Sequence, residues 1–109
     1  MLHTTTLTLN KEFRRVYYRG KAFSTSVVVV YTLKNHKGIR RIGITATKKI
    51  GKAVARNRAR RIIKEAYRLL EDKFPTGYDY VFVARTKAVF SSTGDVMKAM
   101  EYAIRQMKK

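Results

Sequence analysis

The most distinctive chemistry in this sequence is a run of closely spaced cations from Lys48 to Arg68, KKIGKAVARNRARRIIKEAYR. The run holds nine Lys or Arg residues and a single acid, Glu65. The Arg guanidinium is a planar fork that meets phosphate oxygens through two hydrogen bonds, and Lys adds point charge. This density of cations predicts a surface that binds the phosphate backbone of a structured nucleic acid.

Apolar residues recur within this run at the period of an α-helix, so the cations are predicted to lie on a rigid element. The buried stripe spans roughly 120° of the helix and consists of Ala55, Ala59, Ile62, Ile63, Ala66, Leu69 and Leu70. Arg58 is expected beside this stripe. The opposite side is expected to carry Arg56, Asn57, Arg60, Arg61, Lys64 and Arg68, which with Arg58, Lys48, Lys49 and Lys52 form the candidate nucleic-acid face.

Asn57 is the uncharged polar residue at the centre of this face. Its amide would reach a base edge or a 2′-hydroxyl, or it would bond within the helix, and the sequence leaves both alternatives open. Gly51 is predicted to ease the turn into the helix, whose N-terminus is suited to a phosphate.

Aromatic residues form a second candidate group. Phe13 and Tyr17 are one turn apart on a predicted short helix, and Tyr31 lies on a predicted strand. Such residues usually belong to a core, and composition alone favours that interpretation. The alternative is a cleft in which unpaired bases stack, at about 1–3 kcal/mol per base.

The sequence offers few groups for catalysis by protein side chains. His3 and His36 are the available neutral-range bases, one near the terminus and one in a predicted turn. The seven carboxylates are scattered, and the neighbours Glu71 and Asp72 would point about 100° apart on a helix. There is no cysteine, so disulfides and thiolate sites are excluded. We expect no catalytic or metal-ligating site in the protein.

Composition fits one domain, residues 1–109, with no sign of a boundary or repeat. The formal net charge of +18 opposes compaction, which indicates that a polyanion is bound. No apolar run approaches the roughly 20 residues of a membrane span, and MLHTTTLTLN lacks the features of a secretory signal. These patterns predict a cytoplasmic protein.

The remaining sequence predicts the elements that position these groups. Asn10 is expected to cap a helix over Lys11–Arg19, and the long helix is expected to run from near Lys52 to near Lys73. Strands are predicted in SVVVVYTLK, IRRIGITATKK and YDYVFVAR, with an earlier start possible at Phe23, and a last helix includes Val96 to Met107. The order α-β-β-β-α-β-α predicts a single-domain α+β sandwich with a mostly antiparallel sheet.

The central run closely resembles the signature of the bacterial ribonuclease P protein subunit, with Arg56-Asn57-Arg58 at its centre. The resemblance extends to NKEFRRVYYRG, VVVVYTLK, RRIGITATKK and YDYVFVAR, in the family's order, over about residues 9 to 106. It implies a left-handed βαβ crossover through the long helix. It also implies that the protein joins a catalytic ribonuclease P RNA, which removes 5′ leaders from precursor tRNA with Mg²⁺ held mainly by the RNA.

The resemblance also implies site residues. The basic residues around Arg58 would face the catalytic RNA, and Phe13, Tyr17 and Tyr31 would line a cleft for the single-stranded leader. Family members often carry a basic N-terminal segment, which MLHTTTLTLN lacks. Two rival hypotheses remain: a general RNA-binding or ribosomal protein with no processing role, and a membrane-surface binder. The small Ala55, Ala59 and Ala66 disfavour the second, because insertion requires bulky apolar residues. No obligate protein partner is evident.

Overall fold

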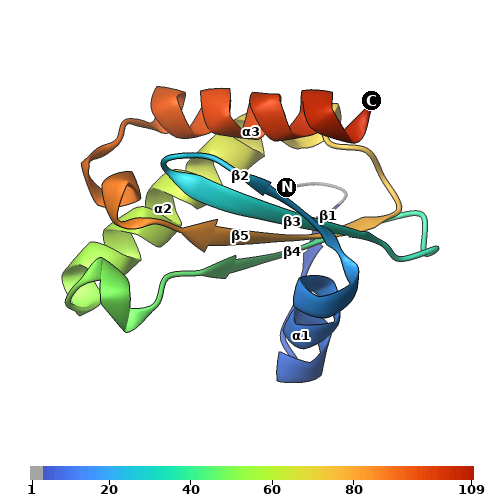
Figure 1. Ribbon diagram of the computed structural model, residues 1–109, viewed down its shortest axis with the longest axis horizontal. Helices are drawn as coiled ribbons and strands as arrows, with labels where there is room; N and C mark the ends of the chain where they lie inside the picture. The colour runs from blue at the N-terminus through green and yellow to red at the C-terminus, as the bar shows by residue number, and fades with distance from the viewer. Residues whose placement is uncertain (1–3) are drawn as a thin grey trace.

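The computed structural model of the protein describes residues 4–109, which form one five-stranded sheet with helices on both faces (Figure 1). The strands are β1 (Thr4–Thr6), β2 (Lys21–Ser24), β3 (Val28–Lys34), β4 (Arg40–Thr45) and β5 (Tyr78–Ala84). The α-helices are α1 (Asn10–Arg19), α2 (Ala53–Leu70) and α3 (Thr93–Met107). Short 3-10 helices follow at η1 (Lys48–Ile50), η2 (Glu71–Lys73) and η3 (Thr86–Phe90). The predicted α+β class is confirmed.

The strand order in the sheet is β1-β4-β5-β3-β2. Strands β2, β3 and β5 pair in the expected antiparallel manner, whereas β1, β4 and β5 pair in parallel. Helix α2 connects β4 to its parallel neighbour β5, as the resemblance implies for the crossover. Phe13 and Tyr17 lie on α1, which precedes β2, whereas the basic run lies mostly on α2, which follows β4. The two groups therefore reach the same sheet from different parts of the chain.

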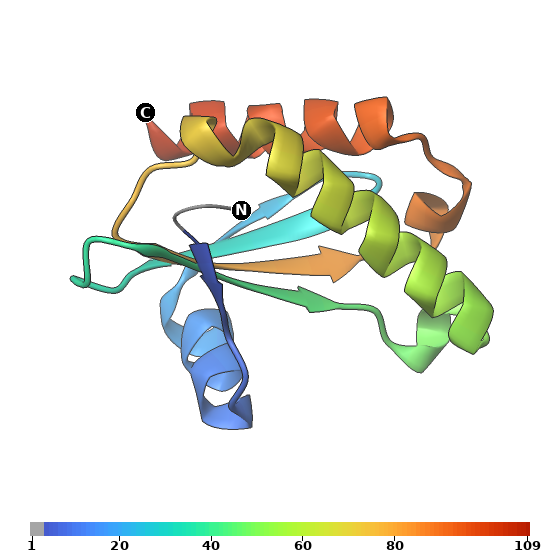
Figure 2. The ribbon, with the colours of Figure 1, turned by 180° about the vertical axis from the view of Figure 1, so that it is seen from behind.

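The sheet separates two layers of helix (Figures 1 and 2). Helices α2 and α3 cover one face, and α1 lies against the other. The larger core fills the space between the sheet and α2 and α3. In it the fully buried rings of Tyr67, Phe74 and Phe82 have centroids 5.2 to 5.8 Å apart, and each such pair adds roughly 0.5–1.5 kcal/mol beyond burial of area. A smaller core of Leu7, Val16 and Val81 lies under α1.

Helix α2 confirms most of the predicted buried stripe. Ala59, Ile63, Ala66 and Leu70 are buried, and Ala55 and Ile62 are half-buried against the core. The prediction for Leu69 is wrong, because this side chain is 51% exposed. Leu69 is about 100° from Leu70 around the helix, at the margin of the stripe. The sequence interpretation also missed Tyr67, which is fully buried because its ring joins the aromatic core.

The N-terminus of α1 differs from the prediction. Asn10 lies within the helix, and the cap is provided by Glu12, whose Oε1 accepts hydrogen bonds from the backbone N–H groups of Thr8 and Leu9 at 3.2 and 3.0 Å. The Glu12 carboxylate, three residues after the N-cap residue Leu9, reaches back to the Leu9 backbone N–H, as the acidic residue of a capping box does. Strand β1 was also not predicted, since three consecutive threonines show no alternation of apolar and polar residues.

Candidate nucleic-acid interface

The predicted cations of the central run belong to η1, to α2 and to Lys52 between them, and we call them the α2 basic face; Figure 2 shows that η1 and α2 follow one another along the same side of the sheet. Most are exposed to solvent: Lys48, Lys49, Lys52, Asn57, Arg58, Arg60, Arg61, Lys64 and Arg68. They do not all lie on one side of the helix. The first turns of α2 instead present guanidinium groups in several directions, set by local contacts described below.

Arg58 is held against the neighbouring segment η3. Its Nε donates a 3.1 Å hydrogen bond to the carbonyl oxygen of Val89. This bond uses one donor and fixes the direction of the side chain, while the terminal nitrogens keep their donors for another acceptor. Two exposed apolar side chains, Val54 and Phe90, belong to the same two segments. Arg58 is therefore preoriented for an external phosphate.

Arg60 lies toward the end of β4. Its Nη2 donates to the carbonyl oxygen of Ala46 at 3.3 Å, and its Nη1 donates to Asn57 Oδ1 at 3.2 Å. The second bond shows that the amide oxygen of Asn57 bonds within the helix. The Asn57 amide nitrogen has no hydrogen bond within residues 4–109, so a base edge remains a possible partner for it.

Arg56 is less exposed than its predicted place opposite the buried stripe implies, and Arg68 is exposed as expected but takes part in an ion pair. Arg56 is half-buried, and its Nε is buried without a hydrogen-bond partner within the described part of the chain. Arg68 pairs with Glu65, with Nη2 to Oε1 at 2.5 Å and Nε to Oε2 at 3.0 Å. The hydrogen bond from Arg68 lowers the pKa of Glu65. Because Arg68 has its charge partly offset by Glu65, the N-terminal half of α2 is the more strongly basic end.

The predicted aromatic residues come together on the α1 side of the sheet, and we call Phe13, Tyr17 and Tyr31 the aromatic surface. All three are half-buried and pack against the smaller core. The rings of Tyr17 and Tyr31 meet edge to face, with centroids 5.0 Å apart and planes at 79°. The Tyr17 hydroxyl shares a 3.2 Å hydrogen bond with Thr45 Oγ1. The rings thus pack against the core on one side and remain partly accessible on the other.

Two residues that support the aromatic surface were missed from the sequence. A Cβ at Gly43 would collide with the ring of Phe13, so this position requires glycine for the ring to lie flat on β4. Thr45 orients Tyr17 through its hydroxyl. Both alternate with Arg41 on the same face of β4, and this period-two pattern within RRIGIT was the available signal.

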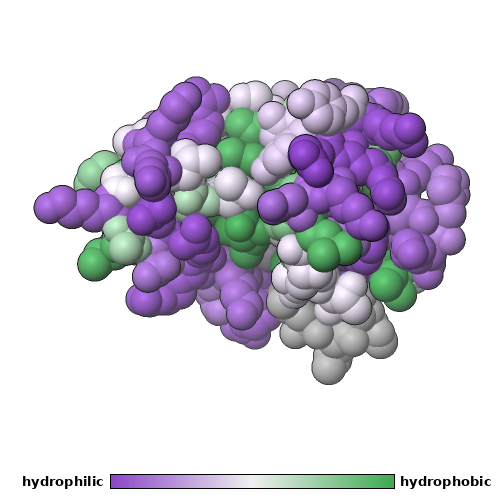
Figure 3. All heavy atoms as spheres, turned by 90° about the horizontal axis from the view of Figure 1, so that it is seen from below, coloured by the Kyte–Doolittle hydropathy of each residue, from purple (hydrophilic) through white to green (hydrophobic). Residues whose placement is uncertain are grey.

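A pocket of about 230 Å³ joins the two candidate surfaces. Phe13 and Gly43 lie on its α1 side, and Lys64 reaches it from α2. Seen from the α1 side, hydrophilic side chains cover most of the molecule, with small apolar patches between them (Figure 3). The pocket is therefore where the α2 basic face and the aromatic surface approach each other.

An ion-pair network fixes α1 to the sheet. Arg41 donates from Nε and Nη2 to the two carboxylate oxygens of Asp79 at 2.8 and 2.7 Å, and from Nη1 to Glu12 at 2.8 Å. The Asp79 carboxylate is nearly inaccessible, with 3% of its side chain exposed. Breaking such a pair leaves a buried charge and costs about 3–5 kcal/mol. The network places α1, and with it Phe13 and Tyr17, at a fixed position over β4 and β5.

The histidine and carboxylates considered for catalysis lie apart. His36 is in the β3–β4 turn, Asp95 caps α3 through the Ser92 backbone N–H at 3.0 Å, and Glu101 lies 3.9 Å from Lys73. Residues 4–109 contain no cluster of three or more potential metal ligands. His3 lies outside the described residues. None of the helices in this range is long and apolar enough to cross a bilayer.

Comparison with known proteins finds similarity to the members of a single family. A family model described as Ribonuclease P matches residues 1–108. The ribonuclease P protein component of Clostridioides difficile strain 630 is 43% identical over 98 residues, covering 89% of this chain and 86% of that protein. The component from Clostridium botulinum strain Loch Maree is 48% identical over 92 residues, covering 84% of this chain and 83% of that one.

Solved structures give the same result for the fold. The RNase P protein of Staphylococcus aureus superposes with a TM-score of 0.81 at 29% identity, covering 94% of both chains. The RNase P protein from Thermotoga maritima superposes with a TM-score of 0.82 at 27% identity, covering 93% of this chain and 96% of that one.

Proposed function

The chain belongs to the ribonuclease P protein family, and from this premise we propose that it uses its two candidate surfaces for two different RNAs. Its role is that of the protein subunit of ribonuclease P in tRNA processing. In our proposal the α2 basic face binds the catalytic RNA. The aromatic surface binds the single-stranded 5′ leader of precursor tRNA.

The observation that carries this proposal is the pocket between Phe13 and Lys64, which connects the two surfaces. The α2 basic face offers preoriented guanidinium groups, which suit a folded RNA whose phosphates have fixed positions. The aromatic surface offers accessible ring edges and faces, which suit bases that are free to unstack. A leader that extends from the docked catalytic RNA would pass directly from the first surface to the second.

We further propose that the hydrolytic chemistry belongs to the RNA subunit. Three of the carboxylates are engaged in ion pairs: Glu12 and Asp79 pair with Arg41, and Glu65 pairs with Arg68. Residues 4–109 contain no group of three or more potential metal ligands, and phosphate oxygens are ligands that Mg²⁺ favours, which supports a metal held mainly by the RNA. The protein would promote cleavage by holding the leader in place and by adding positive charge near it.

Reconstitution with a bacterial ribonuclease P RNA tests this function. At low Mg²⁺ concentration, the protein is expected to stimulate removal of the leader from precursor tRNA, because it supplies substrate affinity that the RNA alone lacks. Salt-sensitive RNA binding without stimulation would instead identify a general RNA-binding protein.

A further inference from the structure

Helix α1 divides its face of the sheet into two parts. Phe13 packs on Gly43 and Tyr17 on Tyr31, above the row in which Tyr31 and Gly43 flank Val81. The next row of the same face consists of Leu33, Asp79 and Arg41, and it forms the floor of a second groove on the other side of the helix. The aromatic surface therefore lies on one side of α1, and the second groove lies on the other.

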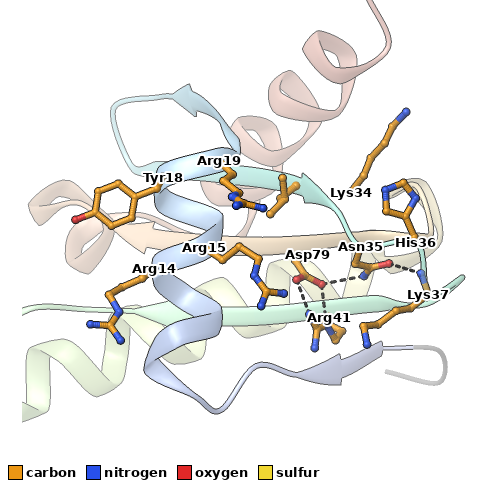
Figure 4. A pocket seen from close by; sticks show the side chains of 11 residues that line it. Arg14, Arg15, Tyr18, Arg19, Lys34, Asn35, His36, Lys37, Arg41 and Asp79 are labelled. Atoms are coloured by element: carbon orange, nitrogen blue, oxygen red, sulfur yellow. Dashed lines mark hydrogen bonds and ion pairs between the residues drawn. The ribbon is translucent and has the colours of Figure 1, made fainter.

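The second groove has a volume of about 790 Å³ and lies between α1 and the β3–β4 turn. Figure 4 shows Arg15 and Arg19 pointing from α1 into it, opposite Lys37 on the turn. We call it the basic groove, because six cationic side chains and one carboxylate line it: Arg14, Arg15, Arg19, Lys34, Lys37, Arg41 and Asp79.

The one carboxylate in the basic groove is already neutralised. Asp79 accepts two hydrogen bonds from Arg41 and a third, at 2.8 Å, from the side-chain amide of Asn35. Asn35 also donates to the carbonyl oxygen of Ile39 at 3.1 Å and accepts from the Lys37 backbone N–H at 2.9 Å. These bonds hold the turn in place, so the wall that carries Lys37 is preorganised.

The remaining five cations have no protein partner for their charge. Within residues 4–109, no side-chain hydrogen bond or ion pair is made by Arg14, Arg15, Arg19, Lys34 or Lys37. Like charges gathered along one groove repel one another. A polyanion relieves this repulsion and releases its own counterions on binding. The chemistry of the basic groove thus matches a phosphate backbone.

We propose that the basic groove binds the phosphates of leader nucleotides that lie upstream of those held by the aromatic surface. This inference rests on the proposed function of the aromatic surface. The crest of α1, by which we mean the side of the helix that faces away from the sheet, connects the two sites. Tyr18 is 85% exposed there. Tyr18 and Arg14 line only the rim of the basic groove, and Figure 4 shows both pointing away from Arg15 and Arg19. A base stacked on Tyr18 would carry the strand over the helix.

The crest also favours a single strand over a duplex as the occupant. Helix α1 has 10 residues and a diameter of about 10–12 Å with its side chains, so a strand that uses both sides must turn sharply. Double helices resist bending on this scale, with a persistence length of about 150 base pairs for DNA. An unpaired leader can make the turn, whereas the duplex parts of tRNA or of the catalytic RNA cannot.

The test compares leaders of two lengths on the reconstituted holoenzyme, for example about 5 and about 15 nucleotides, since compact single-strand sites cover roughly 4–16 nucleotides. The groove variant combines Arg15→Gln, Arg19→Gln and Lys37→Gln. A matched control variant, Lys98→Gln with Arg105→Gln and Lys108→Gln, removes the same charge from exposed positions of α3 and its C-terminal end, beyond the opposite face of the sheet. The equal change in net charge separates local contacts from the general field.

We expect the groove variant to lose roughly tenfold in affinity for the long-leader substrate and little for the short one. For the long leader, the slope of log binding constant against log salt concentration is expected to become shallower by about 0.7 for each phosphate contact that the variant loses on a single strand. Tyr18→Ala is expected to cause a smaller loss with the same dependence on length. The α3 control variant should change both substrates only slightly and equally.

Four outcomes would overturn the inference: no loss for either leader, equal losses for both leaders, an equal loss in the α3 control, or weaker binding of the catalytic RNA by the groove variant without substrate. The last would assign the groove to the catalytic RNA. Tyr17→Ala distinguishes this failure from failure of the proposed function. If Tyr17→Ala weakens both leaders while the groove variant weakens neither, only the basic groove is misassigned. If Tyr17→Ala affects neither, the leader assignment of the aromatic surface is itself wrong.

Discussion

The α2 basic face and the aromatic surface are built in different ways. The first occupies one stretch of 21 residues, Lys48 to Arg68, and a single helix presents most of it. The second combines rings from α1 and β3 with supporting residues on β4, and these residues are up to 32 positions apart, from Phe13 to Thr45. A continuous face can be strengthened or weakened one cation at a time, whereas an assembled surface depends on the packing that brings its parts together.

The largest effect is expected at the α2 basic face. Arg58→Ala removes a preoriented guanidinium, and charge-assisted hydrogen bonds to phosphate support a loss of about 2–3 kcal/mol in binding of the catalytic RNA. The salt dependence of binding should fall by about 0.7–0.9 in log–log slope. The free energy of unfolding should change little, because the Arg58 side chain is exposed. Arg105→Ala on α3 is the control. Unchanged RNA affinity in Arg58→Ala would contradict the docking role.

The next effect separates the aromatic surface from the α2 basic face. Phe13→Ala or Tyr17→Ala should cost about 1–2 kcal/mol in binding of precursor tRNA with a leader, within the range for a stacked base. Binding of mature tRNA and the salt dependence should both remain nearly constant, since no charge is removed. Tyr102→Ala deletes a partly exposed ring from α3 as a control. Equal losses for precursor and mature tRNA would return these rings to a purely structural role.

A smaller effect tests whether the aromatic surface depends on packing. Gly43→Ala places a methyl group against the Phe13 ring, and such overpacking costs about 1 kcal/mol or more in the free energy of unfolding. Leader affinity should fall with it, while binding of the catalytic RNA should not. Gly94→Ala is the matched control, because its Cβ would meet only Ser92 Oγ, at 3.6 Å. Urea unfolding and binding titrations measure the two quantities. Normal leader binding in Gly43→Ala would show that the ring position is unimportant.

The smallest effect concerns the cap of α1. Hydrogen bonds from the Leu9 and Thr8 backbone, and then Arg41, hold the pKa of Glu12 below its usual value of 4.5. A carboxylate with a depressed pKa stabilises the fold fully above its unfolded pKa, and this contribution is lost as pH falls through the folded value. The unmodified protein should therefore have its full advantage in unfolding free energy over Glu12→Gln near neutral pH, and this difference should disappear as the pH falls below 4.5. Unfolding free energies across this range measure it; a constant difference would rule out the titration of Glu12 as its source.

The two surfaces also show how far the sequence could be interpreted. Helical periodicity located α2 and most of its buried stripe, because the period of 3.6 residues is a property of neighbouring residues. It misjudged Leu69 at the margin of the stripe and missed Tyr67, since the width of the contact depends on what packs there. The periodic pattern placed Arg56 on the side opposite the buried stripe, whereas local packing half-buries it.

The aromatic surface was less accessible to this reasoning. Phe13, Tyr17 and Tyr31 were recognised as candidates, and the choice between core and binding site rested on a family resemblance. Their supports, Gly43 and Thr45, were not recognised, and neither was the network of Arg41 with Glu12 and Asp79. These partners are distant in sequence, so no local pattern links them.

The sequence by itself determined the sign of the charge, its concentration between Lys48 and Arg68, and the helix that carries it. Composition and periodicity are local properties, and they remain the same in any fold the chain adopts. Only the tertiary structure decided that α1 crosses the sheet between an aromatic side and a basic side. That position follows from the packing of Val16 on Val81 and from the ion pairs of Arg41, which form only when distant strands meet.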